Sequence, residues 1–135
     1  QNAGVNSPEL FIYDDNGSAV PYLAFIESGS SISVMRYNGS SWVYVGQGQF
    51  APSDYLSLYV KDNIPYVSYR STLGSSYKAS AKRYYNSAWE QLGTDQFTSG
   101  KIEYPAMLVD SSDNMYFGYS DFVLNEVIMR KLEVK

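Results

Sequence analysis

The chain has 135 residues and contains no cysteine and no histidine. These absences exclude disulfides, thiolate nucleophiles, zinc sites built from Cys and His, and imidazole-based triads or proton relays. No stretch approaches the roughly 20 apolar residues of a membrane-spanning helix, so we expect no membrane span. Positive charge is not in surplus either, because the formal net charge is −4 at pH 7. Nucleic acid is therefore not an expected partner, since a phosphate-backbone binder needs a basic stripe to displace counterions.

Hydrophobic and aromatic residues are abundant, at 44% and 16% of the chain, and 14 residues are tyrosine. Short runs rich in Val, Ile, Tyr and Phe alternate with Gly, Asn, Asp and Ser, and no segment shows sustained helical periodicity. This pattern predicts an all-β chain. Dipeptides that tolerate positive φ predict tight turns: Asn16-Gly17, Asn38-Gly39, Asp62-Asn63, Asn86-Ser87 and Asp113-Asn114.

A repeat organises the chain. The stretch "SISVMRYNGSSWVYVGQGQF" at 31–50 aligns without a gap with "KASAKRYYNSAWEQLGTDQF" at 78–97, so that Trp42 matches Trp89. Likewise "PYLAFIES" at 21–28 returns as "PYVSYRST" at 65–72 and more faintly as "MYFGYSDF" at 115–122. Periods of about 40–50 residues in an all-β chain are typical of four-stranded propeller blades.

Each unit is expected to contain up to four strands, and the units span about 8–52, 53–101 and 102–135 of one domain. The third unit stops before any fourth strand. The expected first strands of the units are 9–13, 55–60 and 105–109, and the second strands are 21–26, 65–70 and 115–120. The expected third strands are 31–37, 77–84 and 126–132, and the fourth strands of units 1 and 2 are 41–46 and 88–92.

One column of the repeat is always small: Ala24, Ser68 and Gly118, each flanked by bulky residues. Side chains alternate between the two faces of a strand. A small residue between large ones therefore allows a neighbouring sheet to approach closely at one point. We predict that the three sheets stack face to face at these positions.

The pattern "PYVSYR … KASAKRYYNSAWEQLG … F" resembles the repeats of bacterial β-propeller proteins, whose blades follow a P-Y-V-A-Y … Y-N-G-x-x-W-x-x-x-G scheme. The resemblance covers about residues 8–135 and implies a partial β-propeller of about three four-stranded antiparallel blades, the last lacking its outer strand. Propellers host lectins, adhesins, scaffolds and enzymes alike. The WD signature is absent, and "YDDNGSAV" at 13–20 lacks the tryptophan of a sialidase Asp-box.

Propellers generally close with about 4–8 blades, and this chain supplies fewer than three. We therefore expect either a homo-oligomer or a piece of a longer propeller. Two copies that form a six-bladed ring are the simplest closed particle. The missing fourth strand would come from a partner chain or from residues 1–7.

The candidate ligand-binding residues are Arg36, Arg83, Lys131, Tyr44 and Tyr85. The three cations recur near the end of each third strand, where they could hold a carboxylate or a sulfated sugar. Alternatively, each cation pairs with an acid such as Glu27 or Asp121 at the rim of a sheet. Tyr44 and Tyr85 lie at positions where the repeats do not share a tyrosine. The tyrosine side chain is suited to contact with both sugar rings and protein surfaces.

The acids do not suggest a catalytic pair or a metal site. Asp14-Asp15 and "DSSDN" at 110–114 lie in expected turns, where Asp hydrogen-bonds its own backbone. We therefore expect no cofactor, no metal and no catalytic residues.

Together these features favour a non-enzymatic, lectin-like recognition module of a secreted or cell-surface bacterial protein, which binds carbohydrate or a protein partner. The alternatives are a fragment of a propeller glycoside hydrolase or lyase, and a purely structural oligomerisation scaffold.

Overall fold

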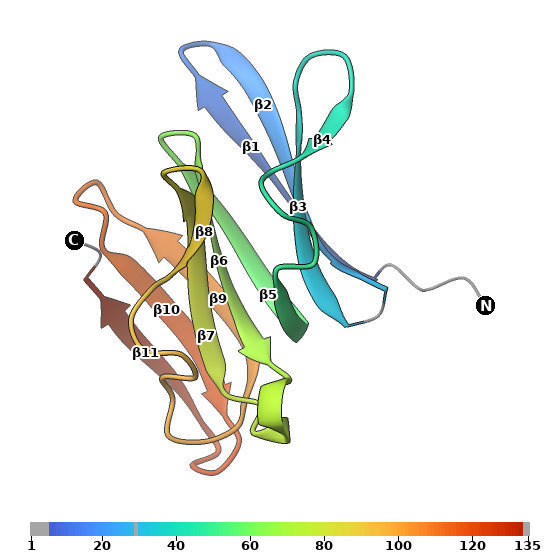
Figure 1. Ribbon diagram of the computed structural model, residues 1–135. Helices are drawn as coiled ribbons and strands as arrows, with labels where there is room; N and C mark the ends of the chain where they lie inside the picture. Colours follow the sequence, from blue (N-terminus) through green and yellow to red (C-terminus); the bar gives the residue numbers. More distant parts are fainter. Residues whose placement is uncertain (1–5, 29, 134–135) are drawn as a thin grey trace.

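The computed structural model describes residues 6–28 and 30–133 and confirms an all-β chain of antiparallel sheets (Figure 1). Eleven strands and one short 3₁₀ turn, Leu73–Ser75, are present in this part of the chain. We call the strands of successive repeats units 1, 2 and 3. Unit 1 contains β1 (Asn6–Asp15), β2 (Ser18–Glu27), β3 (Ser31–Tyr37) and β4 (Trp42–Tyr44). Unit 2 contains β5 (Ala51–Lys61), β6 (Ile64–Ser71), β7 (Ala79–Tyr85) and β8 (Ala88–Gln91). Unit 3 contains β9 (Ile102–Val109), β10 (Met115–Asp121) and β11 (Glu126–Leu132).

Every expected strand is present. The first strand of each unit begins earlier than expected, at Asn6, Ala51 and Ile102, and in units 1 and 2 the pairing also runs on to the hairpin tip, where the turn is tight. Asp62 and Asn63 have φ of 51° and 62°, and Asn86 and Ser87 have φ of 52° and 65°. Two consecutive positive φ values match the right-handed twist of the flanking strands in a two-residue hairpin. The turn dipeptides therefore set the register of these hairpins.

The sequence repeat is also a repeat of hydrogen bonds. The Val45 amide donates to the Val34 carbonyl (2.8 Å), and 47 positions later the Leu92 amide donates to the Ala81 carbonyl (2.9 Å). At the same offset, the Ser33 and Ser80 hydroxyls each accept from a loop amide at 2.8 Å. Units 1 and 2 thus share the path of the chain after the third strand, not only its composition.

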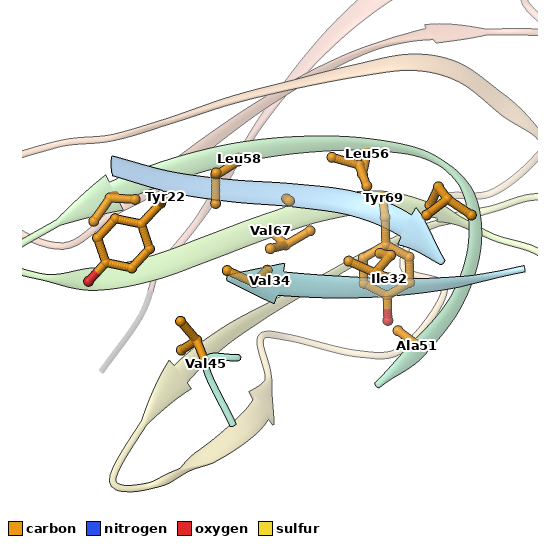
Figure 2. Close-up of a cluster of buried hydrophobic side chains, with 12 residues drawn as sticks. Tyr22, Ile32, Val34, Val45, Ala51, Leu56, Leu58, Val67 and Tyr69 are labelled. Atoms are coloured by element: carbon orange, nitrogen blue, oxygen red, sulfur yellow. The ribbon is translucent and has the colours of Figure 1, made fainter. Parts of the chain in front are cut away.

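The three units stack face to face. Each is an antiparallel meander, and a short pairing between β3 and β5 formally joins units 1 and 2 into one sheet. The first strands β1, β5 and β9 pack against one another in that order. One buried cluster lies between units 1 and 2 (Figure 2), and a second lies between units 2 and 3.

Unit 2 is covered on both faces because its second strand alternates between the two clusters. Val67 and Tyr69 belong to the cluster with unit 1, and Tyr66 belongs to the cluster with unit 3. From the other side of the second cluster, unit 3 contributes Met115 and Phe117, both fully buried. Each unit therefore presents one face to the unit before it and the opposite face to the unit after it.

Of the three small residues at equivalent positions of the repeat, two are buried and the third, Gly118, is partly exposed. Ala24 and Ser68 are fully buried, and by strand alternation each faces the following unit. The Ser68 hydroxyl has no hydrogen-bond partner among the described residues, so its small size matters more than its polarity. Gly118 lies on the outer face of unit 3, where no described residue covers it. The predicted close approach is therefore present between units 1 and 2 and between units 2 and 3.

Trp89 joins the first two units, as expected for a packing residue. Its ring stacks on Phe50 at 3.9 Å between centroids, and its Nε1 donates to the Val45 carbonyl (2.9 Å). Trp42 differs, because it is 41% exposed and contacts only Tyr37 among the aromatic residues of the described chain.

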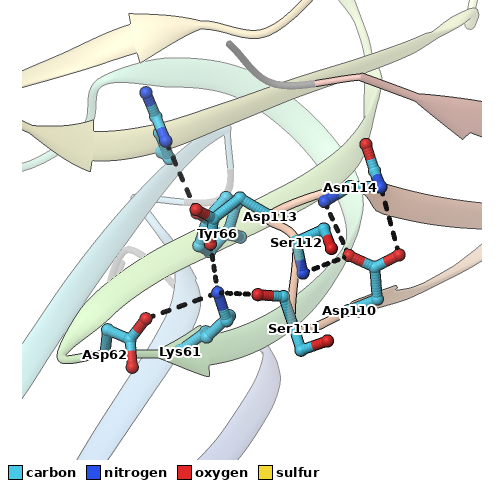
Figure 3. Close-up of polar contacts among 9 residues, drawn as sticks. Lys61, Asp62, Tyr66, Asp110, Ser111, Ser112, Asp113 and Asn114 are labelled. Atoms are coloured by element: carbon cyan, nitrogen blue, oxygen red, sulfur yellow. Dashed lines mark hydrogen bonds and ion pairs between the residues drawn. The ribbon is translucent and has the colours of Figure 1, made fainter.

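Polar contacts join units 2 and 3 at both ends of the interface. The nearly buried Arg70 pairs with Asp54 in its own unit and lies 3.8 Å from the Glu103 carboxylate of unit 3. At the other end, Lys61 forms an ion pair with Asp113 and reaches the Ser111 carbonyl (3.4 Å) in the turn before β10 (Figure 3). These contacts fix the lateral register of two sheets whose apolar faces alone would allow sliding.

Replacing Ala24 with leucine tests the stacking. The added side chain must enter a fully packed interface, so we expect Ala24→Leu to lower the free energy of unfolding by about 1–3 kcal/mol, measured by urea denaturation. Gly118→Ala is the control, because a Cβ there meets only the Ile128 carbonyl at 3.9 Å. Equal stability of Ala24→Leu and the unaltered chain would show that units 1 and 2 do not pack at this point.

Candidate functional site

The three candidate cations occupy the same register position in their units. Each lies on the third strand opposite a tyrosine of the second strand: Arg36 opposite Tyr22, Arg83 opposite Tyr66 and Lys131 opposite Tyr116. The predicted column is therefore present in the structure. The surroundings of its three members nevertheless differ, because the neighbouring strands and units differ.

Arg83 is a buried, paired cation. Its Nε forms an ion pair with Glu90, the residue opposite on β8. Its guanidinium also approaches the Tyr66 hydroxyl (3.5 Å) and lies 4.2 Å from the centre of the Tyr85 ring. The carboxylate and two aromatic rings satisfy this arginine, so it serves the structure of unit 2.

Lys131 is exposed on the edge strand β11, with Nζ 3.9 Å from a Glu133 carboxylate oxygen. Such a surface pair contributes little, roughly 0–1 kcal/mol. Lys131 does not line either of the cavities that contain Arg36. The ring of three equivalent cations is therefore not one binding site in this chain.

Arg36 is exposed and has no acidic partner. The residue opposite it on β4 is Val43, where the second repeat has Glu90. No carboxylate oxygen lies within 4.0 Å of its guanidinium in the described part of the chain. Burial raises the pKa of the neighbouring Tyr22 hydroxyl although Arg36 acts to lower it, so that hydroxyl stays neutral.

Two adjoining cavities share Arg36 and Asn63. The larger, about 410 Å³, opens at the end of units 1 and 2 where the β1–β2, β3–β4 and β5–β6 turns meet. The smaller is about 200 Å³. The residues lining the larger cavity are Ser18, Ala19, Val20, Arg36, Tyr37, Asn38, Gly39 and Asn63. Tyr22, Tyr44, Val45, Gly46 and Tyr84 line the smaller one together with Arg36 and Asn63.

Arg36, Asn38 and Asn63 bring side-chain hydrogen-bond donors to these cavities. The Asn38 side-chain oxygen accepts the Ser40 and Ser41 amides (3.0 and 2.9 Å). The Asn63 side-chain oxygen accepts the Tyr22 hydroxyl. Each asparagine therefore retains its NH₂ group, which has no other partner among the described residues. The Arg36 guanidinium adds further donors, and among the described residues no Asp or Glu lines either cavity.

The two candidate tyrosines lie at different sites. Tyr44 lines the smaller cavity with Arg36, but its hydroxyl donates to Glu27 (2.8 Å), which also accepts the Ser33 hydroxyl (2.6 Å). These bonds hold the pKa of Glu27 below its usual range. Tyr85 instead lies against Arg83. The structure thus brings together Arg36 with Tyr44, and Arg83 with Tyr85.

Arg83 and Lys131 do pair with acids, Glu90 and Glu133, but neither Glu27 nor Asp121, the two acids named as examples, is a partner of these cations. Glu27 bonds Ser33 and Tyr44, and Asp121 accepts the Val123 and Leu124 amides (2.9 and 2.8 Å) in the turn that follows β10. Both carboxylates are used within their own unit, because a short-range hydrogen bond is made at less entropic cost than a distant ion pair.

Asp110 and Asp113 lie in a turn as expected, whereas Asp14 and Asp15 are the last residues of β1, next to the turn. Asp14 accepts the Gly17 amide (2.7 Å), and Asp110 accepts the Ser112 and Asn114 amides (2.8 and 3.0 Å; Figure 3). Residues 6–28 and 30–133 contain no group of three acidic residues placed to hold a metal ion.

Sequence reasoning missed Asn38 and Asn63 as candidate site residues. Both were assigned to turns, and they do form turns, but those turns meet at the cavity. The gapless alignment did contain one usable signal, since it sets Val43 against Glu90 and so distinguishes Arg36 from Arg83.

No family model matches the chain, and no curated protein matches it. In the described residues, no helix is both long enough and apolar enough to cross a membrane.

The two arginines should differ in their effect on stability. Glu90→Gln removes the carboxylate from a guanidinium whose side chain is 10% exposed, so we expect a loss of about 1 kcal/mol in the free energy of unfolding. Arg36→Gln should change stability by less than about 0.5 kcal/mol, as surface substitutions do. Urea denaturation of both variants measures the difference, and equal losses would show that Arg36 has a structural partner.

Proposed function

We propose that the chain is a non-enzymatic recognition module of propeller-type blades, and that it binds an acidic carbohydrate at the Arg36 cavity. The observation behind this proposal is that three residues with side-chain donors, Arg36, Asn38 and Asn63, line one cavity that no described carboxylate lines. We further propose that the module belongs to a secreted or cell-surface bacterial protein, in keeping with its Ser, Asn, Gly and Tyr content and the resemblance of its repeats.

The stacking of the units supports a propeller-type array. Three meanders follow one another along the chain, each packs on the next through equivalent faces, and their first strands are neighbours. In a propeller, the first strands of the blades surround the axis. Unit 3 would be the blade without its outer strand.

The chemistry of the donors favours an anionic ligand. A guanidinium presents five N–H donors in a planar fork that matches the two oxygens of a carboxylate or sulfate. Two amide NH₂ groups nearby suit further ligand oxygens, such as sugar hydroxyls. A neutral or cationic ligand would leave Arg36 without a counter-charge.

An aromatic surface adjoins these donors. Tyr37 and Trp42 pair across the β3–β4 hairpin with ring centroids 5.7 Å apart, and Trp42 is partly exposed. A flat, accessible indole is suited to the apolar face of a sugar ring. Arg36 directly precedes Tyr37 in sequence and lines the same cavity, so one sugar residue could engage the donors while a neighbouring residue stacks on the aromatic pair.

The enzyme alternative lacks support at this cavity. A glycoside hydrolase of the usual kind needs two carboxyl groups on either side of the scissile bond, and neither cavity is lined by one. The scaffold alternative is favoured by a different observation, the open faces of units 1 and 3 described below.

Glycan binding tests the proposal. We expect the chain to retain uronic-acid or sulfated glycans on an array and not their neutral counterparts, with binding that weakens as salt screens the charge. Arg36→Gln should reduce affinity about tenfold or more, since a hydrogen bond to a charged group contributes about 1.5–3 kcal/mol.

Val43→Glu is the complementary variant, because it places a carboxylate opposite Arg36 as Glu90 lies opposite Arg83. It should abolish binding while leaving the arginine in place. Arg130→Gln removes the same charge from an exposed position on β11 and should bind normally. Retention of acidic glycans by both cavity variants, or no acidic ligand at all, would refute the proposal; a shortened glycan after incubation would favour the enzyme.

A further inference from the structure

The outer face of unit 3 is apolar and open, although the same face is buried in the other two units. Val127 and Met129 are 84% and 75% exposed. Their equivalents on the third strands of units 1 and 2 are fully buried against the next unit: Ile32 and Val34, and Ala79 and Ala81. The third strand of unit 3 therefore has the apolar side chains of a packed face, but no described residue packs on them.

The outer face of unit 1 shows the converse. Leu10 and Ile12 on β1 are 64% and 60% exposed. Their equivalents on the first strands of units 2 and 3 are nearly buried against the preceding unit: Leu58 and Val60, and Met107 and Val109. Among the described residues, no sheet covers this face of unit 1 or the outer face of unit 3.

A hollow marks the contact point on unit 3. It measures about 190 Å³, and its exposed surface is entirely apolar. Its floor lies at Gly118, the third member of the small column, with Ala106, Leu108, Tyr116 and Met129 around it. At the equivalent point of unit 1, Ala24 belongs to one buried cluster with Leu58 and Val67 of the next unit. The counterparts of Leu58 and Val67 on unit 1 are Leu10 and Leu23.

We propose that the outer face of unit 3 binds the outer face of unit 1 of a second copy of this chain, with Leu10 of that copy in the hollow over Gly118. The contact repeats the two interfaces within the chain. In each of these, the face that one unit presents to the next packs on the face that the next unit presents back to it. This head-to-tail contact is heterologous. It does not depend on the Arg36 cavity or its ligand.

A like-on-like contact is disfavoured by shape. Two unit 3 faces would set hollow against hollow, and two unit 1 faces would set Leu10 and Ile12 against the same protruding residues without a recess. Only unit 3 against unit 1 pairs a recess with a bulky side chain, as Ala24 is paired inside the chain. Open apolar faces of this kind on a small domain mark interaction surfaces.

Sedimentation of the unaltered chain over a range of concentrations gives the first test. We expect a particle of at least twice the mass of one chain. Leu10→Asp and Met129→Asp should each give monomers, because each adds a charge to one side of the only contact of this kind. Both positions are exposed, so both variants should remain folded, with the circular dichroism spectrum of the unaltered chain and with unfolding midpoints equal to each other. Leu73→Asp, at another exposed apolar site on the 3₁₀ turn, is the control and should still associate.

Mixing the two monomeric variants gives the decisive test. Leu10→Asp retains an intact unit 3 face and Met129→Asp retains an intact unit 1 face, so an equimolar mixture should recover a species of two chains. A monomeric unaltered chain at every concentration would overturn the proposal. So would association that is abolished by only one of the two variants, or a mixture that stays monomeric, since these results indicate like-on-like contact or none.

Discussion

Face-to-face packing of small sheets is the constraint on which the rest of this structure depends. A meander of three or four strands has too little apolar area to be stable alone, and it must bury its faces against neighbours. Here each fully buried large side chain contributes about 1.5–3 kcal/mol, whereas a polar contact such as that of Arg70 with unit 3 contributes about 1 kcal/mol. The apolar faces therefore stabilise the stack, and the ion pairs determine its register.

The candidate site follows from the same packing. Where units 1 and 2 meet, their hairpin turns approach one another but do not fill the space between them, and a cavity remains. Asn63 bonds Tyr22 across the interface, which holds the β5–β6 turn beside Arg36. The turns thus have two roles, since they reverse the chain and also supply the donors of the cavity. A single difference between repeats, Val43 in place of Glu90, leaves one arginine of the column without a carboxylate.

Repetition has a cost at the ends of the array. A repeated unit that buries both faces in the interior exposes the same apolar faces at the ends. Four positions on the outward faces of units 1 and 3 are apolar although solvent reaches them: Leu10, Ile12, Val127 and Met129. The terminal faces are in this respect like interior ones, and this likeness is the physical basis for expecting a contact between copies.

The sequence by itself determined the strands, the turns and the period, because these depend on local properties: side-chain alternation, the positive φ of Asp62-Asn63 and Asn86-Ser87, and the recurrence of Trp42 as Trp89. It also indicated the small column, since a steric requirement at an interface leaves a visible gap in a run of large residues. Only the tertiary structure decided that Arg83 is paired with a carboxylate while Arg36 has none within 4.0 Å in the described part of the chain, and that Glu27 and Asp121 bond within their own units. It alone placed Asn38 and Asn63 at one cavity. Those outcomes depend on which turns and strand ends meet in space, and the relative placement of two sheets is a long-range property that no local pattern specifies.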